Sequence, residues 1–406
     1  MLFKQVSSRI ADEIHQQARY ARDGNIYWRG PTGIVEGRAR AGPVGPYLYP
    51  GTLGIALFLA ASERHRRSGA DRDLCLQALV PLRREIAGLA AASDPAVPAS
   101  QLIGGLSGFG SFLYSLVTIG EILELPELQE EAHLLSSFLT LEAISQDEHF
   151  DIMFGSAGAL LALLALERRV PERNRAGFTP LDLAGFCARH LLDRQVPAAT
   201  GGSGWPNGPA GKPVGGFAHG SAGICYALLR LFERTGEPRL RAAALSGVEH
   251  ERSLFVSEAG NWRIAWRPDL RFVNTWCNGA PGIILGRIGG LGGCDDPEVR
   301  REIERGLQLT RTLQLDQDDH ICCGNMGRVE ILLFAYRKLG DTTLLAAAER
   351  LAEGIVLRAE ERQSFGLMAS SSGIFDPRFF LGLTGIGYSL LHLVDPANLP
   401  FVVAMD

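Results

Sequence analysis

The sequence predicts an all-α fold: one domain over residues 1–406, built as an α/α toroid of seven inner and seven outer helices. A G-x-x-G turn followed by an apolar run occurs seven times, which indicates an internal repeat. Each run is apolar nearly all round, which is typical of a buried helix. More polar, amphipathic segments alternate with these runs and are expected to cover them. The first glycines of the turns are Gly51, Gly105, Gly155, Gly220, Gly279, Gly324 and Gly382.

The seven inner helices are expected to begin around the second glycine of each turn. Glycine permits a close approach of the chain and dihedral angles that other residues resist. In chain order, the runs are GIALFLA from Gly54, GFGSFLYSL from Gly108, GALLALLAL from Gly158, GICYALLRL from Gly223, GIILGRI from Gly282, GRVEILLFA from Gly327 and GIGYSLLHL from Gly385.

The seven outer helices are expected in the amphipathic segments between the runs. In the segment 296–315, Asp296 can cap a helix and Pro297 suits its first position. Asp341 can cap another helix over 341–358 in the same way. The remaining segments lie near 6–22, 73–92, 120–142, 180–193 and 238–257.

Alternation of buried and covering helices makes all inner helices run in one direction, and closing the array removes its open ends. The seven turns then lie on one rim. Long loops rich in glycine, proline or aromatic residues fall on the same rim, which predicts that this is the working face. These loops are 23–50, 194–215, 259–275 and 360–378.

Composition narrows the class of protein. The chain is 46% hydrophobic and 21% charged with a net charge of −5, which is typical of a globular protein and disfavours nucleic acid as a partner. Its seven cysteines form no dense framework, which favours a reducing compartment. No stretch reads as a signal peptide or a membrane span, so the expected location is the cytoplasm.

Side chains that can bind a metal ion or take part in catalysis stand just ahead of four consecutive turns. Asp151 precedes the third turn, His219 the fourth, Cys277 the fifth, and Cys322 with Cys323 the sixth. Consecutive repeats are neighbours in a ring, so these residues are expected to meet. Three thiols together predict a Zn²⁺ site, and three protein ligands leave the fourth position open, as in catalytic zinc sites.

The neighbouring histidine suggests a reaction at that site. A thiol that coordinates the metal is deprotonated and becomes a nucleophile. His219 can act as a general acid or base near neutral pH, and Asp151 can orient it or tune its pKa.

Other interpretations of these residues stay open. Single cysteines at helix starts are usually buried and inert, and Cys322–Cys323 can in principle form a vicinal disulfide. His219 can be structural, and Asp151 can simply cap its helix. His320 can compete as a ligand or acid, and the role of Cys225 is left undecided. Cys75, Cys187 and Cys294 lack the turn context and are interpreted as structural thiols.

The chain resembles the lanthipeptide cyclase family. The motifs that carry the resemblance are W-C-x-G-x-P-G at 276–282, G-x-A-H-G-x-x-G at 216–223 and C-C-G at 322–324, within the sevenfold repeat. Details such as Y-L-Y-P-G-T-L-G-I-A-L-F-L-A (47–60) resemble the C-terminal cyclase half of class II lanthipeptide synthetases. The dehydratase half of those enzymes has no counterpart here, so we expect a free-standing cyclase or an isolated domain.

The resemblance implies a zinc enzyme that adds peptide cysteines to dehydroalanine or dehydrobutyrine and closes thioether rings. It places zinc on Cys277, Cys322 and Cys323, and acid–base chemistry on His219 with Asp151 beside it. A dehydrated precursor peptide is the implied substrate, with a dehydratase as a possible partner. The common family pattern is C-H-G, so Cys323 departs from it and places the chain with the all-cysteine subset. That subset is associated with relaxed substrate choice.

Three rival functions are compared with the residues of the rim motifs. A zinc-dependent transferase of small thiols such as glutathione needs the same ligands. A non-catalytic scaffold with structural zinc needs a fourth protein ligand, for which His320 and Cys225 are candidates. A toroidal glycosidase needs paired carboxylates at the mouth, and only Asp151 lies in the rim motifs.

Overall fold

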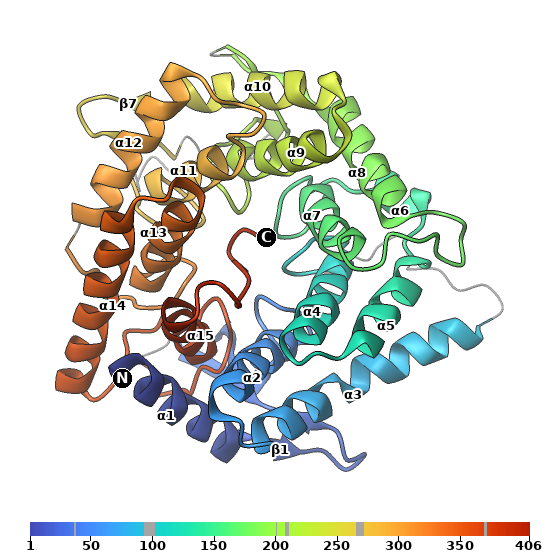
Figure 1. Ribbon diagram of the computed structural model, residues 1–406, viewed down its shortest axis with the longest axis vertical. Coiled ribbons are helices and arrows are strands. Elements are labelled where there is room, and N and C mark those ends of the chain that lie inside the picture. The colour runs from blue at the N-terminus through green and yellow to red at the C-terminus, as the bar shows by residue number, and fades with distance from the viewer. Residues whose placement is uncertain are drawn as a thin grey trace.

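A computed structural model describes residues 1–35, 38–92, 102–199, 201–207, 211–264, 272–312, 314–368 and 372–406. The helices form two concentric layers in a ring, and both layers follow the chain around it (Figure 1). The predicted α/α toroid is therefore confirmed.

Within the described residues, the inner layer consists of seven helices that each begin directly after a glycine of a G-x-x-G turn. Each contacts the next, and the last contacts the first, so the ring is closed. Nearly every residue of these helices is buried, as their all-round apolar sequence requires. They are α2 (Thr52–Arg66), α4 (Phe109–Ile122), α7 (Ser156–Glu167), α9 (Ser221–Thr235), α11 (Ala280–Gly289), α13 (Asn325–Leu339) and α15 (Leu383–Val394).

The outer layer contributes one covering helix to each inner helix. The N-terminal helix packs on α15, so the two ends of the chain complete the same repeat. A short helix, α6 (Leu141–Ser145), lies outside the sevenfold pattern. The outer helices are α1 (Leu2–Gln17), α3 (Ala70–Ala91), α5 (Pro126–Ser136), α8 (Pro180–Arg194), α10 (Pro238–Arg252), α12 (Pro297–Thr312) and α14 (Thr342–Arg362).

The outer helix expected over 120–142 is shorter than predicted. Residue 120 still belongs to α4, and a turn with Glu124 at φ 56° separates it from α5. Pro126 is the reason, because proline has no N–H and restricts the residue before it, so it is suited to the first turn of a helix. The N-terminal helix lies nearer the start of the chain than predicted, since it spans Leu2–Gln17 rather than about 6–22.

Short antiparallel hairpins occupy three of the four predicted rim loops. Residues 36–37, 200, 208–210, 265–271 and 369–371 of these loops lie outside the described part of the chain. The paired strands are β1 (Arg19–Tyr20) with β2 (Ile26–Tyr27), β3 (Arg29–Val35) with β4 (Arg38–Pro43), β5 (Val196–Pro197) with β6 (Ser203–Gly204), and β7 (Phe255–Val256) with β8 (Asn261–Trp262).

The second glycine of a turn is required by close packing against the loop before it. A Cβ added at Gly282 would lie 2.1 Å from the carbonyl oxygen of Trp276, and one at Gly327 would lie 2.2 Å from that of Ile321. Real Cβ atoms do not come this close to a carbonyl oxygen. The residues just ahead of each turn, cysteines included, are therefore held tightly over the start of an inner helix.

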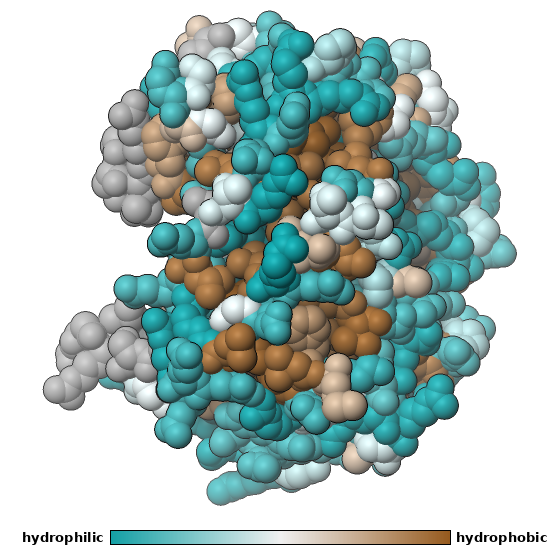
Figure 2. All heavy atoms as spheres, turned by 60° about the vertical axis from the view of Figure 1, so that its left-hand side comes forward, coloured by the Kyte–Doolittle hydropathy of each residue, from teal (hydrophilic) through white to brown (hydrophobic). Residues whose placement is uncertain are grey.

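The outer surface of the ring is not uniformly polar. A groove of about 800 Å³ runs between α1 and α14, with Val6, Ile10, Val356 and Phe365 among its lining residues. Figure 2 shows hydrophobic areas between hydrophilic ones on this side of the molecule. No described helix is both long enough and apolar enough to span a bilayer.

Candidate functional site

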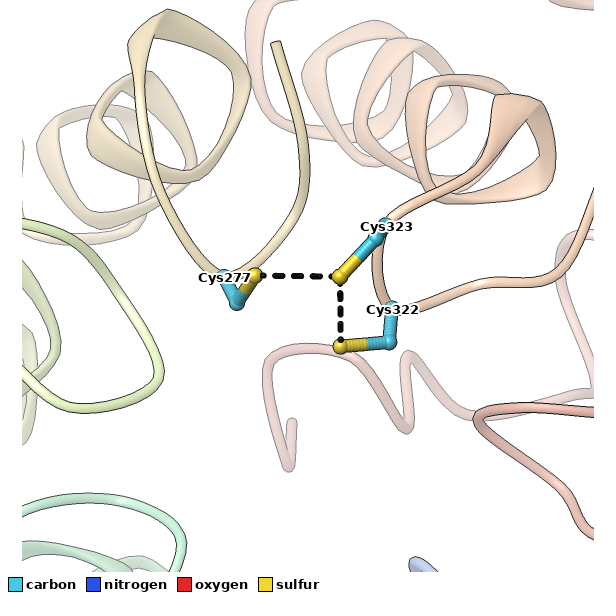
Figure 3. A group of neighbouring side chains, drawn as sticks. All are labelled: Cys277, Cys322 and Cys323. Atoms are coloured by element: carbon cyan, nitrogen blue, oxygen red, sulfur yellow. Dashed lines mark hydrogen bonds between the residues drawn. The ribbon is translucent and has the colours of Figure 1, made fainter. Parts of the chain in front are cut away.

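Three cysteines from two adjacent turns form one cluster. Cys277 comes from the turn before α11, and Cys322 and Cys323 from the turn before α13 (Figure 3). The Sγ atoms of Cys277 and Cys323 are 3.6 Å apart, and those of Cys322 and Cys323 are 3.4 Å apart. All three sulfur atoms lie within 4.8 Å of one another, as a shared metal ion requires.

The thiols of the cluster share protons unequally. Hydrogen bonds from Cys322 and Cys323 lower the pKa of Cys277 well below that of an ordinary thiol, although burial opposes this. The same contacts with Cys277 raise the pKa of Cys322 and of Cys323, because the loss of either proton would place a second negative charge beside the first. Cys277 therefore gives up its proton more readily than Cys322 or Cys323.

Metal binding should therefore release protons. A metal ion takes the sulfurs as thiolates, and Cys322 and Cys323 hold their protons more tightly than an ordinary thiol, so we expect protons to leave as the ion binds. Protons compete with the metal for these sulfurs, so the affinity should rise with pH and fall in acid. Calorimetric titration with zinc in buffers of different ionisation enthalpy measures the number released. Zinc uptake without proton release would contradict the cluster as its site.

Polar neighbours hold the cluster in place. The Thr275 hydroxyl lies 3.3 Å from the Cys277 sulfur, and the backbone N–H of Asn278 donates to the same hydroxyl. The backbone N–H of Cys323 donates to Nδ1 of His320, 3.4 Å away. His320 is fully buried, and this hydrogen bond stabilises the turn that carries Cys322 and Cys323. It does not belong to the group of side chains that share the metal position.

The remaining cysteines lie apart from the cluster. Cys225 is fully buried inside α9, and burial raises the pKa of its thiol. No second group of three or more metal-binding side chains occurs within the described residues. All seven cysteines are free, so the alternative of a vicinal disulfide at Cys322–Cys323 is wrong for this structure.

His219 and Asp151 form a hydrogen-bonded pair beside the cluster. Nδ1 of His219 lies 2.8 Å from Oδ2 of Asp151, and the other carboxylate oxygen accepts the backbone N–H of Phe154 at 2.7 Å. Asp151 is buried, whereas the His219 side chain is 42% exposed. The Phe154 ring stacks on the imidazole at 5.5 Å. Burial disfavours the imidazolium, but Asp151, with a smaller contribution from Cys277, outweighs this and raises the pKa of His219.

Backbone hydrogen bonds fix the histidine turn against the first cysteine. The N–H groups of Phe217 and Ala218 donate to the carbonyl oxygen of Cys277 at 3.0 and 3.3 Å. The distance between His219 and the sulfur cluster is therefore set by main-chain contacts rather than by flexible side chains. The five residues expected to meet do meet on one rim.

Buried acidic residues brace these turns, and the sequence reasoning missed them. Asp147 accepts hydrogen bonds from the Ser156 backbone and hydroxyl, and Glu251 accepts the N–H of Gly216. Asp319 accepts the amide of Asn325 and the N–H of Gly366. Asp147 and Asp319 stand shortly before their turns in sequence, which is a signal that could have been found. Glu251 comes from the outer helix α10 and has no such signal.

Comparison with known proteins gives the family of the chain and solved structures that resemble it. A family model for "Lanthionine synthetase C-like protein" matches residues 42–404. The chain belongs to the lanthionine synthetase C-like family. Among solved structures, nisin cyclase is similar, with a TM-score of 0.62, 18% identity, and coverage of 88% of this chain and 92% of that one. An unsaturated glucuronyl hydrolase from Bacillus sp. GL1 gives a TM-score of 0.49 and 14% identity, covering 86% and 98%. Comparison with curated proteins found no match.

Membership of the lanthionine synthetase C-like family accounts for the toroid, and the similarity to nisin cyclase supports the same fold. The family model begins at residue 42, so α1 and the β3–β4 hairpin lie almost wholly outside the matched region. Even so, α1 supplies the outer helix of the seventh repeat.

Proposed function

We propose that this protein is a zinc-dependent lanthipeptide cyclase contained in one domain over residues 1–406. The observation that carries the proposal is the cluster of three cysteine sulfurs within 4.8 Å of one another, on the same rim as the His219–Asp151 pair. Its substrate would be a precursor peptide with dehydroalanine or dehydrobutyrine residues, made in the cytoplasm by a dehydratase. The product would carry lanthionine or methyllanthionine rings.

The donor set suits zinc. Thiolate sulfur is a soft ligand that zinc prefers, and Cys277, Cys322 and Cys323 would hold it. When bound, zinc would take the cysteine thiol of the peptide as a thiolate and so make it a nucleophile. No fourth histidine, cysteine or carboxylate joins the cluster within the described residues, which supports an open position over a closed structural site.

His219 would exchange the proton that is transferred in the addition. The new C–S bond forms at Cβ of the alkene, the π-electron pair shifts to Cα, and Cα then takes a proton. The thiol loses one proton and Cα gains one, so the overall reaction is balanced. Asp151 engages Nδ1 of His219, which leaves Nε2 as the nitrogen that can exchange this proton with the substrate.

Asp151 would be a positioning residue in this scheme. Its carboxylate is held by the N–H of Phe154 and in turn fixes the imidazole ring. Its charge also raises the pKa of His219, which keeps the ring protonated to higher pH. Both effects favour donation of a proton to the intermediate formed after thiolate attack.

Transfer of a small thiol is the rival activity to be tested. A dehydrated peptide that carries its own cysteines is incubated with the protein and an excess of glutathione, with a control lacking protein. We expect ring closure to dominate, because a thiol in the same peptide has an effective concentration in about the millimolar range. Cyclisation leaves the mass unchanged and removes alkylatable thiols. Protein-dependent glutathione adducts as the main product would favour the transferase instead.

A further inference from the structure

The last residues of the chain lie inside the ring. Figure 1 shows the chain turning back after α15 and ending near the centre of the toroid. Residues 401–405 are all buried, at 7% exposure or less. The Tyr388 hydroxyl of α15 donates to the carbonyl oxygen of Pro400 at 2.7 Å. Residues 400–406, which we call the plug, therefore pack inside the ring.

Charge and ring contacts hold the plug against several inner helices. The Asp406 carboxylate meets Arg230 of α9 at 2.9 Å, Lys338 of α13 at 2.7 Å and Arg168, just after α7, at 3.4 Å. Phe401 packs edge-on against Phe334 of α13 at 5.1 Å. Burial disfavours a charge on Asp406, but these cations outweigh it and lower its pKa to about 2.

The plug reaches the site through Trp276, the residue before Cys277. The indole Nε1–H donates to the carbonyl oxygen of Val403 at 2.8 Å, and the side chain is fully buried. The Trp276 side chain thus contacts the plug, and the next residue in the chain is the first cysteine of the cluster, Cys277.

Trp276 also contacts the histidine turn through Phe217, and it is linked to the Cys322–Cys323 turn through Phe380. Its ring meets Phe217, two residues before His219, at 5.9 Å, and Phe380 at 4.9 Å. The carbonyl oxygen of Phe380 in turn accepts the N–H of Cys322 at 2.9 Å. A shift of the indole would therefore displace Cys277, the histidine turn and the Cys322–Cys323 turn relative to one another.

We propose that the plug is a positioning element for the cysteine cluster: by holding Trp276 from inside the ring, it sets the separation of Cys277 from Cys322 and Cys323. This rests on the proposed metal-binding role of the three cysteines. Metal ligands are commonly oriented by partners outside the ligand set, and a change in those partners costs about 10- to 100-fold in affinity. Here the partner is a main-chain carbonyl of a distant segment.

The test compares identical substitutions at three buried tryptophans. Trp276→Phe removes the hydrogen bond to Val403 and keeps an aromatic ring. Trp205 and Trp28 are also fully buried and donate to the carbonyl oxygens of Leu191 at 2.8 Å and Ile14 at 2.9 Å, away from the cluster. Zinc affinity is measured by competition with a chelator, and site geometry by the absorption spectrum of bound cobalt. We expect Trp276→Phe to weaken zinc binding about tenfold or more and to alter the spectrum.

Trp205→Phe and Trp28→Phe should leave metal affinity within about twofold of the unmodified protein, whatever they do to stability. Asp406→Asn tests the plug from its other end, and Asp406→Glu should restore affinity. Equal affinities for the Trp276 variant and its two controls, or no effect of Asp406→Asn, would overturn the proposal.

A separate readout distinguishes this proposal from the zinc assignment. If the unmodified protein holds no metal, the zinc proposal fails, and the plug is then judged by the alkylation rate of Cys277. The Trp276 variant should change that rate, because the position and exposure of the Cys277 sulfur depend on the contact of the neighbouring indole with Val403. An unchanged rate would overturn the role of the plug.

Discussion

Cys323→Ala is expected to lose bound zinc and to reduce cyclisation by more than about a hundredfold, beyond the usual cost of changing a partner outside the ligand set. The Cys323 sulfur lies within 3.6 Å of both other sulfurs, so its removal leaves only two donors. It also removes one of the hydrogen bonds that lower the pKa of Cys277. Metal content and the rate of thiol loss from a dehydrated peptide measure the two effects.

Two further variants test whether the loss of zinc and of cyclisation in Cys323→Ala comes from the missing metal ligand. Cys323→His supplies a ring nitrogen at the same place and should recover zinc and part of the activity. Cys187→Ala removes a fully buried thiol from the outer helix α8 and should lower stability while leaving the zinc content unchanged. Full cyclisation by metal-free Cys323→Ala would refute the proposed mechanism.

His219→Ala is expected to keep zinc and to lower turnover by about 10²- to 10⁴-fold, the usual contribution of a general acid or base. The imidazole contacts Asp151 and Phe154 and contributes no atom to the sulfur cluster, so the metal should stay. Metal analysis and kcat, measured on the same preparation, check both halves. Loss of zinc together with activity would instead assign His219 a structural role.

His149→Ala is the matched control for that variant. His149 stands ahead of the third turn and is exposed. The centre of its ring lies 5.6 Å from that of Phe154. The imidazole of His219 bonds to a buried carboxylate, whereas His149 meets one through its backbone N–H, which donates to Asp147 at 2.9 Å. Its replacement should leave kcat nearly unchanged.

The pH dependence of turnover follows from the raised pKa of His219. A proton donor is active below its pKa, so the rate should fall as pH rises through a value above that of an ordinary histidine. Asp151→Asn removes the charge that raises this pKa and should move the fall to lower pH. A rise in rate over the same range would show that the neutral ring acts as a base.

The sequence by itself determined the architecture and predicted which side chains lie together on the rim. Seven glycine turns, each followed by a run that is apolar all round, leave few arrangements other than a closed double ring. In that ring, turns far apart in sequence lie on one rim, so Asp151, His219 and the three cysteines could be placed together. Periodicity carried this information because each repeat packs on its neighbours in the same way.

The tertiary structure alone decided how these groups are held. Glu251 reaches the histidine turn from an outer helix, and Val403 reaches Trp276 from the end of the chain. Such contacts leave no periodic trace, because they join segments outside the repeat whose approach depends on packing across the whole ring. For the same reason, the separation of the sulfurs and the lowered pKa of Cys277 could only be learned from the assembled fold.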